Sequence, residues 1–162
     1  MISAIVGATN DYRKEKKFQE LTMVENKKKM IELIRGGKKV SVHVDNIVVG
    51  DLVKIRSGME IAGDGILVIG NDVKVDESSM TGESKMLKKE VFPRCLIARE
   101  MAWAREGVKE NTHSVPSMVM LSGTKVSSGE GMYVIIAVGP NSAFGKIMDY
   151  LVTEQESNNS KL

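Results

Sequence analysis

The middle of this chain is a succession of short apolar runs separated by turn signals. Val40, Val42 and Val44 alternate with polar residues, which is the period-two pattern of a half-buried strand. Further β-type runs are predicted at residues 52–56, 66–69, 73–75, 118–121, 124–127 and 132–138. Turn signals lie between them: Gly50-Asp51, Ser57-Gly58, Asp64-Gly65, Gly70-Asn71-Asp72 and the hairpin signal Gly129-Glu130-Gly131. This spacing, with few helices in between, predicts a β-sandwich or barrel-like body.

A helical pattern precedes the β region. Residues 10–35 combine an intermittent apolar stripe with many charges, and Asn10 or Asp11 can cap the start. Gly36-Gly37 can end the helix, which gives a helical segment over residues 10–37. A helix this long and polar is either a surface strut or two shorter helices.

Two helices are predicted later in the chain. Residues 88–114 interrupt the β pattern, and the run 96–106 within them predicts a short helix in an inserted surface loop. Residues 142–152 form an amphipathic pattern that predicts a closing helix. The polar tail, residues 153–162, is predicted to be disordered.

The composition excludes several kinds of site. Aromatic residues make up only 4% of the chain, so the core must be aliphatic, and stacking platforms for single-stranded nucleic acid are not expected. The single cysteine, Cys95, excludes an internal disulfide and a cysteine-rich zinc site. His43 and His113 have no partner at metal-ligand spacing, so no metal site is predicted. Phosphate-loop, dinucleotide-binding, EF-hand and serine-hydrolase motifs are also missing from the sequence.

Basic residues gather near the beginning of the chain, although the formal net charge is only +2. One interpretation is a surface for anionic lipid or nucleic acid. The other is the solvated face of a helix, because acidic residues are interleaved with the basic ones. The basic residues are Arg13, Lys14, Lys16, Lys17, Lys27, Lys28, Lys29, Arg35, Lys38 and Lys39.

Chemistry is concentrated in residues 75–84, where three carboxylates and four hydroxyls follow a predicted strand. Gly82 permits a positive φ and close approach of its backbone to another surface. Glu83 follows Gly82 directly, so its carboxylate can be displayed at a loop tip. A displayed carboxylate can orient and deprotonate a water, an effect worth roughly 10²–10⁴-fold in rate. From the residues alone, a polar turn without chemistry is the preferred interpretation of the segment.

The loop Thr81-Gly82-Glu83-Ser84 matches the TGES motif of P-type ATPase actuator domains, and its neighbours match in the same order. The resemblance covers most of residues 10–152. The accompanying motifs are Val49-Gly50-Asp51-Leu52-Val53, Ala62-Gly63-Asp64-Gly65-Ile66-Leu67, Val75-Asp76-Glu77-Ser78-Ser79-Met80, Leu121-Ser122-Gly123-Thr124 and Val138-Gly139-Pro140-Asn141-Ser142.

Within that family the chain is most similar to the plasma-membrane-type (type IIB) calcium pumps. Asn10-Asp11-Tyr12 and Gly70-Asn71-Asp72-Val73-Lys74 carry this closer resemblance. The sequence departs from the family pattern in two places. Ala62-Gly63 replaces the usual Pro-Ala, and residues 85–117 are longer than usual, which indicates an insert.

The resemblance implies a mainly β fold with flanking helices, a distorted jelly-roll or β-sandwich. Residues 1–9 would be the stub of a preceding membrane helix, and residues 10–152 the actuator domain. Its β-body would consist of residues 38–87 and 115–138.

The resemblance also implies roles for individual residues. Glu83 would be the catalytic residue that activates water against an aspartyl phosphate, while Thr81 and Ser84 hold the loop and Gly82 lets it approach. The remaining motif residues would be structural: Gly50, Asp51, Asp64, Gly65, Asp76, Glu77, Ser78, Gly123 and Thr124.

The implied partners lie in the same pump, at the cytosolic face of a membrane. They are the phosphorylation and nucleotide-binding domains, which would hold ATP and Mg²⁺, and the membrane helices. This chain has no DKTGT motif, so we expect it to carry no cofactor and to be soluble and catalytically silent alone.

Two alternatives belong to other functional classes. The first is a β-rich interaction module that binds anionic lipid or a protein through its basic helix or the 88–114 insert, with the loop as an epitope. The second is a self-standing hydrolase, which has little support because neither a nucleophile–base pair nor a metal site is evident. Nucleic acid is not an expected partner.

Overall fold

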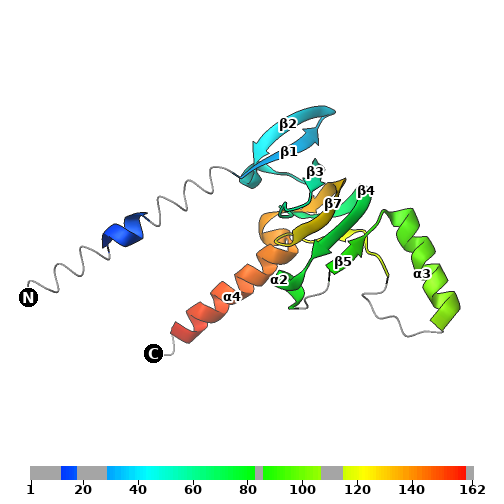
Figure 1. Ribbon diagram of the computed structural model, residues 1–162. Coiled ribbons are helices and arrows are strands. Elements are labelled where there is room, and N and C mark those ends of the chain that lie inside the picture. Colours follow the sequence, from blue (N-terminus) through cyan, green and yellow to red (C-terminus); the bar gives the residue numbers. More distant parts are fainter. Residues whose placement is uncertain (1–11, 18–28, 83–85, 107–114, 160–162) are drawn as a thin grey trace, which may run out of the picture.

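The computed structural model describes residues 12–17, 29–82, 86–106 and 115–159. Its body is a single antiparallel sheet in the order β2-β1-β3-β7-β4-β5, with β6 also paired to β4 (Figure 1). This confirms the predicted fold class, mainly β with flanking helices. The strands are β1 (Met30–Arg35), β2 (Lys38–His43), β3 (Leu52–Arg56), β4 (Asp64–Asp76), β5 (Met86–Lys89), β6 (Val119–Met120) and β7 (Lys125–Ala137).

The centre of the sheet is the long pair β4 and β7, each of 13 residues. They pair from Asp64 opposite Ala137 to Asp76 opposite Lys125, with several register shifts between. The predicted turn at residues 70–72 and the predicted hairpin at residues 129–131 are therefore wrong. Both segments lie inside continuous strands and face each other in the register.

The physical reason is that these glycines allow the backbones of β4 and β7 to approach each other closely, and they do not reverse the chain. A Cβ on Gly129 would come within 2.3 Å of the Asp72 carbonyl oxygen, and one on Gly131 within 2.3 Å of the Ile69 carbonyl oxygen. Glycine inside a strand marks bulges and close backbone approach, and here it permits two bent strands to stay paired.

The helix predicted over residues 10–35, with the helical strut extended to residue 37, is wrong from residue 30 onward. Residues 12–17 are helical, but Met30–Arg35 is strand β1, and the Gly36-Gly37 pair makes the turn into β2. Ile31 and Leu33 are buried on alternate positions, a strand period that the neighbouring charges obscured. Residues 10, 11 and 18–28 lie outside the described part of the chain.

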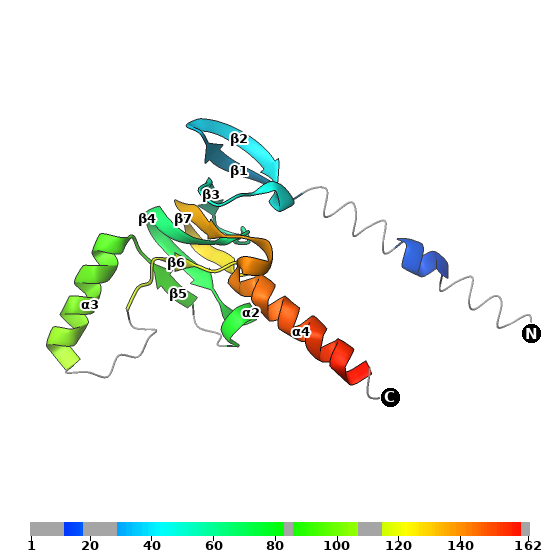
Figure 2. The same cartoon turned by 180° about the vertical axis from the view of Figure 1, so that it is seen from behind.

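Helices extend from the sheet at two places. The helix predicted over residues 96–106 is confirmed within α3 (Phe92–Glu106), which begins four residues earlier, and residues 88 and 89 belong to β5. The closing helix α4 (Ala143–Asn159) runs past residue 152, so disorder is wrong for residues 153–159. No glycine or proline stops the helix there, and Glu and Gln favour its continuation. Figure 2 shows α3 and α4 on opposite sides of the sheet.

The core is aliphatic apart from Tyr133, as the low aromatic content predicts. Gly65 packs against this ring, and a Cβ on Gly65 would come within 2.3 Å of Tyr133 Cδ2. Among the described residues, no helix has the length and apolar character needed to cross a membrane. The buried hydrophobic residues are Ile31, Leu33, Ile47, Val53, Ile55, Ile61, Leu67, Val73, Val75, Met120, Val126, Tyr133 and Ile135.

Candidate functional site

The candidate loop begins with α2 (Ser78–Thr81), a single helical turn in the connection from β4 to β5. Asp76 Oδ1 accepts a 2.9 Å hydrogen bond from the Ser78 N–H as the strand ends. Thr81 Oγ1 donates to the Glu77 carbonyl at 3.1 Å, which ties the end of the turn to its start. The sequence motif therefore starts on an ordered helical turn. Glu83 and Ser84 lie outside the described residues.

Gly82 ends α2 in the left-handed conformation, with φ 74° and its N–H bonded to the Ser78 carbonyl at 3.0 Å. The residue is exposed, and a Cβ there would meet no atom of the described residues within 4 Å. Glycine is therefore favoured here by backbone conformation, since most other residues pay about 1–2 kcal/mol in this region.

A second motif from far along the chain supports α2. Ser79 Oγ donates a 2.9 Å hydrogen bond to the carbonyl of Gly123, 44 positions later. Thr124 is fully buried and its Oγ1 donates to the Leu121 carbonyl at 2.6 Å, which closes this turn. A Cβ on Gly123 would come within 2.6 Å of the Phe144 ring, so the turn is also packed against α4.

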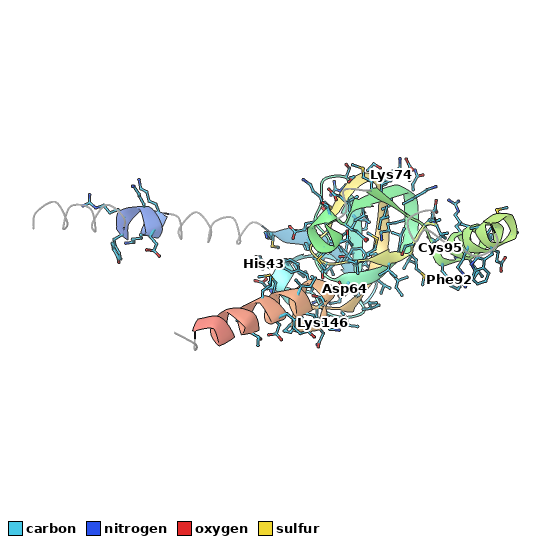
Figure 3. The ribbon with its side chains drawn as sticks, turned by 90° about the horizontal axis from the view of Figure 1, so that it is seen from below. His43, Asp64, Lys74, Phe92, Cys95 and Lys146 are labelled. Atoms are coloured by element: carbon cyan, nitrogen blue, oxygen red, sulfur yellow. The ribbon has the colours of Figure 1, made fainter. Side chains whose placement is uncertain are left out.

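Asp64 connects this turn to α4. Its Oδ1 accepts from the N–H and the hydroxyl of Ser122 at 2.9 and 2.7 Å, and its Oδ2 accepts from the Ala143 N–H at 2.6 Å. An anion is favourable at a helix N-terminus, where N–H groups lack internal partners. Figure 3 labels Asp64 in the region where α4 meets the sheet. Asp64 therefore joins the Ser122 turn to the first residue of α4.

Asp76 is held ionised at the base of the loop. Hydrogen bonds from the Ser78 side chain and backbone, helped by the nearby Lys125 charge, keep the pKa of Asp76 below its ordinary value. Because Lys125 lies opposite Asp76 in the β4–β7 register, the end of β4 has a charged partner on β7.

The Gly50-Asp51 motif belongs to a different part of the sheet. Asp51 is buried and accepts from Arg35 Nε at 2.7 Å, from Arg35 Nη2 at 2.6 Å and from the Val48 N–H at 2.9 Å. These bonds, those from Arg35 above all, hold the pKa of Asp51 below its ordinary value. Gly50 turns the chain here with φ 94°. The motif fastens β1 to the segment that leads into β3.

Sequence reasoning missed a buried ion pair beside the loop. Lys89 Nζ lies 2.5 Å from Glu77 Oε1, and both residues are buried. Glu77 was expected only as a structural motif residue, and Lys89 had no assignment. Lys89 lies on the inward-facing side of the short strand 86–89, where it pairs with the buried Val73. A lysine at such a position needs a carboxylate partner, and this was the signal available in the sequence. In the described part of the chain, no group of three or more His, Cys, Asp or Glu side chains gathers to hold a metal.

The class of protein follows from this fold and motif arrangement. The model of the P-type ATPase actuator domain family matches residues 25–152, and the chain belongs to that family. Two solved structures of a zinc-transporting PIB-type ATPase share the fold, with TM-scores of 0.55 and 0.57 at 16% identity. They cover 79% and 80% of this chain, which covers 17% of each of theirs.

The more similar relatives are calcium pumps, as the resemblance implies. The chain is 36% identical over 148 residues to "Calcium-transporting ATPase 2" of Cryptococcus neoformans, covering 91% of this chain and 10% of that protein. It is 35% identical over 161 residues to human "Plasma membrane calcium-transporting ATPase 4", covering 99% of this chain and 11% of that protein. The chain thus spans about a tenth of the length of these relatives.

Proposed function

We propose that this chain is the actuator domain of an ATP-driven calcium pump. In that pump Glu83 would activate the water that hydrolyses an aspartyl phosphate formed on another domain. The names of the relatives support calcium as the transported ion. The motif order and the anchoring of α2 support the role of the loop.

The observation that carries the proposal is the exposed, left-handed Gly82 at the end of an anchored helical turn. Ser79 is fastened to Gly123, and Asp76 to Ser78, so the base of the turn is fixed to the β-body. At Gly82 the turn is exposed, and a Cβ built on this residue would meet no atom of the described residues within 4 Å. A fixed base that ends at an exposed glycine is the arrangement needed to bring the next residue, Glu83, to a phosphate on another domain.

The chemistry requires few groups on this chain. Water attacks phosphorus and gives its proton to the Glu83 carboxylate, while the bond from phosphorus to the aspartyl oxygen breaks. The products are inorganic phosphate and a free aspartate. Such hydrolysis depends mainly on positioning and electrostatics. ATP and Mg²⁺ would be bound by the other domains, so this chain alone has no hydrolytic activity.

Conditional docking would couple hydrolysis to transport. If the loop reaches the phosphate in only one conformational state of the pump, dephosphorylation can occur only in that state. The helical residues 12–17 and helix α4 lie toward the two ends of the chain, where membrane helices of the pump would connect at its cytosolic face. They would transmit domain rotation to those helices.

The test is Glu83→Gln in the full-length pump, with phosphoenzyme formed from labelled ATP. Formation stays normal, and decay slows by about 10²-fold, the loss expected of a general base. Glu130→Gln, on an exposed position of β7, is the matched control and leaves decay unchanged. Decay at the wild-type rate in Glu83→Gln would contradict the assignment.

Anionic lipid at the basic N-terminal region remains a second candidate role. Arg13, Lys16 and Lys17 are exposed on the helical residues 12–17. Cosedimentation of this chain with phosphatidylserine-containing vesicles tests it. Salt-sensitive binding that Glu83→Gln leaves intact would support this role, and absence of binding would remove it.

A further inference from the structure

The ion pair between Glu77 and Lys89 spans the loop connection. Glu77 is 5% exposed and Lys89 is 3% exposed, and the charged atoms are 2.5 Å apart. The two residues are twelve positions apart, with the whole TGES motif between them. The pair therefore ties the segment entering the loop to the strand leaving it.

Stability alone is a poor explanation for this pair. Removing two charges from water costs several kcal/mol per ion, and well-packed apolar side chains in their place are often equally stable. A buried ion pair can instead specify one arrangement among several. The question is which arrangement this one specifies.

The backbone carbonyl of Glu77 accepts several of the hydrogen bonds that hold α2 together. It accepts from the Met80 N–H at 2.9 Å, from the Thr81 N–H at 3.0 Å and from Thr81 Oγ1 at 3.1 Å. The side chain of the same residue is held by Lys89. A rotation of Glu77 would therefore move the turn, and Gly82 at its end, as well.

Lys89 is a well-anchored partner for this purpose. Its strand pairs with β4 on one side, where Lys89 lies opposite Val73. On the other side, the Ser117 N–H donates to the Lys88 carbonyl and the Glu90 N–H donates to the Ser117 carbonyl, both at 3.1 Å. Ser117, in the segment that follows α3, thus holds β5 at the edge of the sheet (Figure 1).

We infer that Lys89 is a positioning residue: it binds the buried Glu77 carboxylate and thereby sets the direction in which Gly82 presents Glu83. This inference rests on the proposed function of the loop. A misplacement of about 1 Å at a reacting group can cost about 10²-fold in rate. We therefore expect Lys89→Met in the full-length pump to slow phosphoenzyme decay about tenfold, while phosphoenzyme formation is unchanged.

The experiment separates positioning from folding with a second variant. Lys89→Met leaves Glu77 charged and unpaired, so it also destabilises the domain. Glu77→Met/Lys89→Met replaces both charges with apolar side chains of similar length and should unfold near the wild-type temperature. If the charge pair positions the loop, decay stays slow in this double variant. Lys88→Met is the control, because Lys88 is an exposed neighbour in the same strand that pairs with Glu90 instead.

Each outcome decides the inference. Slow decay in the double variant, with normal formation and normal thermal unfolding, supports it. Wild-type decay in the double variant overturns it, because packing alone would then suffice, and this variant decides even where Lys89→Met fails to fold. Slow decay in Glu83→Gln together with wild-type decay in the double variant removes only this inference. Wild-type decay in Glu83→Gln removes the proposed function, and the inference with it.

Discussion

Asp64, at the start of β4, accepts a 2.6 Å hydrogen bond from the backbone N–H of Ala143, the first residue of α4 and 79 positions away. The same carboxylate holds the Ser122 turn, whose neighbour Gly123 supports α2. One side chain thus connects the central strand, the helix that leads away from the sheet and the support of the candidate loop.

Asp64→Ala should destabilise this chain by about 1–3 kcal/mol. The substitution leaves the Ser122 N–H without its acceptor and removes an anion from a helix N-terminus. Urea unfolding of the purified chain, followed by circular dichroism, measures the change. Asp149→Ala, at an exposed position within α4, should change stability by less than about 0.5 kcal/mol. Equal effects of the two substitutions would show that Asp64 is not a junction.

Asp51 should make the stability of the chain depend on pH in acid. Its pKa is lowered in the folded state by Arg35, so its contribution is complete above the unfolded value, about 3.9. The contribution is lost as pH falls through the lower folded pKa. Asp51→Asn should therefore be less stable than the wild type at pH 7, and the difference should shrink as pH falls below about 4.

Unfolding free energies of both proteins at several pH values test this. Asp76 also has a lowered pKa and contributes to the slope of both proteins, so the difference between them isolates Asp51. A difference that is constant with pH would mean that Asp51 acts through packing and not through its charge.

Gly82 substitutions should separate conformation from close approach. Gly82→Ala should cost about 1–2 kcal/mol, because φ is 74° there, whereas Gly82→Asn should cost less, since asparagine tolerates the left-handed region. In the full-length pump both side chains should slow phosphoenzyme decay by obstructing contact with the phosphate. Thermal unfolding and decay rates of the two variants are compared. If the phosphoenzyme of Gly82→Asn decays at the wild-type rate, Gly82 is needed only for its backbone conformation and not for close approach to the phosphate.

Gly65→Ala should be more destabilising than Gly63→Ala. A Cβ on Gly65 would come within 2.3 Å of the Tyr133 ring and 2.4 Å of the Val134 carbonyl, whereas the nearest atom for Gly63 is at 3.0 Å. Overpacking a core typically costs about 1–3 kcal/mol, and the upper end is expected when backbone is among the obstructing atoms. Denaturant midpoints of the two variants give the comparison. A smaller loss in Gly65→Ala would mean that β4 and β7 can separate at this point without cost.

Much of the candidate site is local and could be predicted. The turn residues around Gly82, the cap-like Asp76-Ser78 contact and the tight Ser122-Gly123-Thr124 turn depend on groups a few positions apart. The motif order was sufficient for the family, and the comparison confirms it over residues 25–152. The roles of Glu83 and Ser84 stay predictions.

The errors came from segments whose partner lies elsewhere. Residues 30–35 have helix-compatible composition, yet they are a strand because β2 and β3 supply backbone partners on both sides. Residues 129–131 have the composition of a turn, yet they lie inside β7, where Glu130 and Gly131 pair with Asn71 and Gly70 of β4. Propensity cannot anticipate such partners, since tertiary context overrides it.

The sequence by itself determined the β-rich class, the aliphatic core and the chemistry available at residues 75–84, because these depend on composition, period and local turn geometry. Only the tertiary structure decided that Asp64 receives the N-terminus of α4, that Arg35 satisfies Asp51 and that Lys89 holds Glu77. Each of these contacts joins groups at least twelve positions apart, and chain folding must bring them together before their charges or hydrogen bonds have any effect.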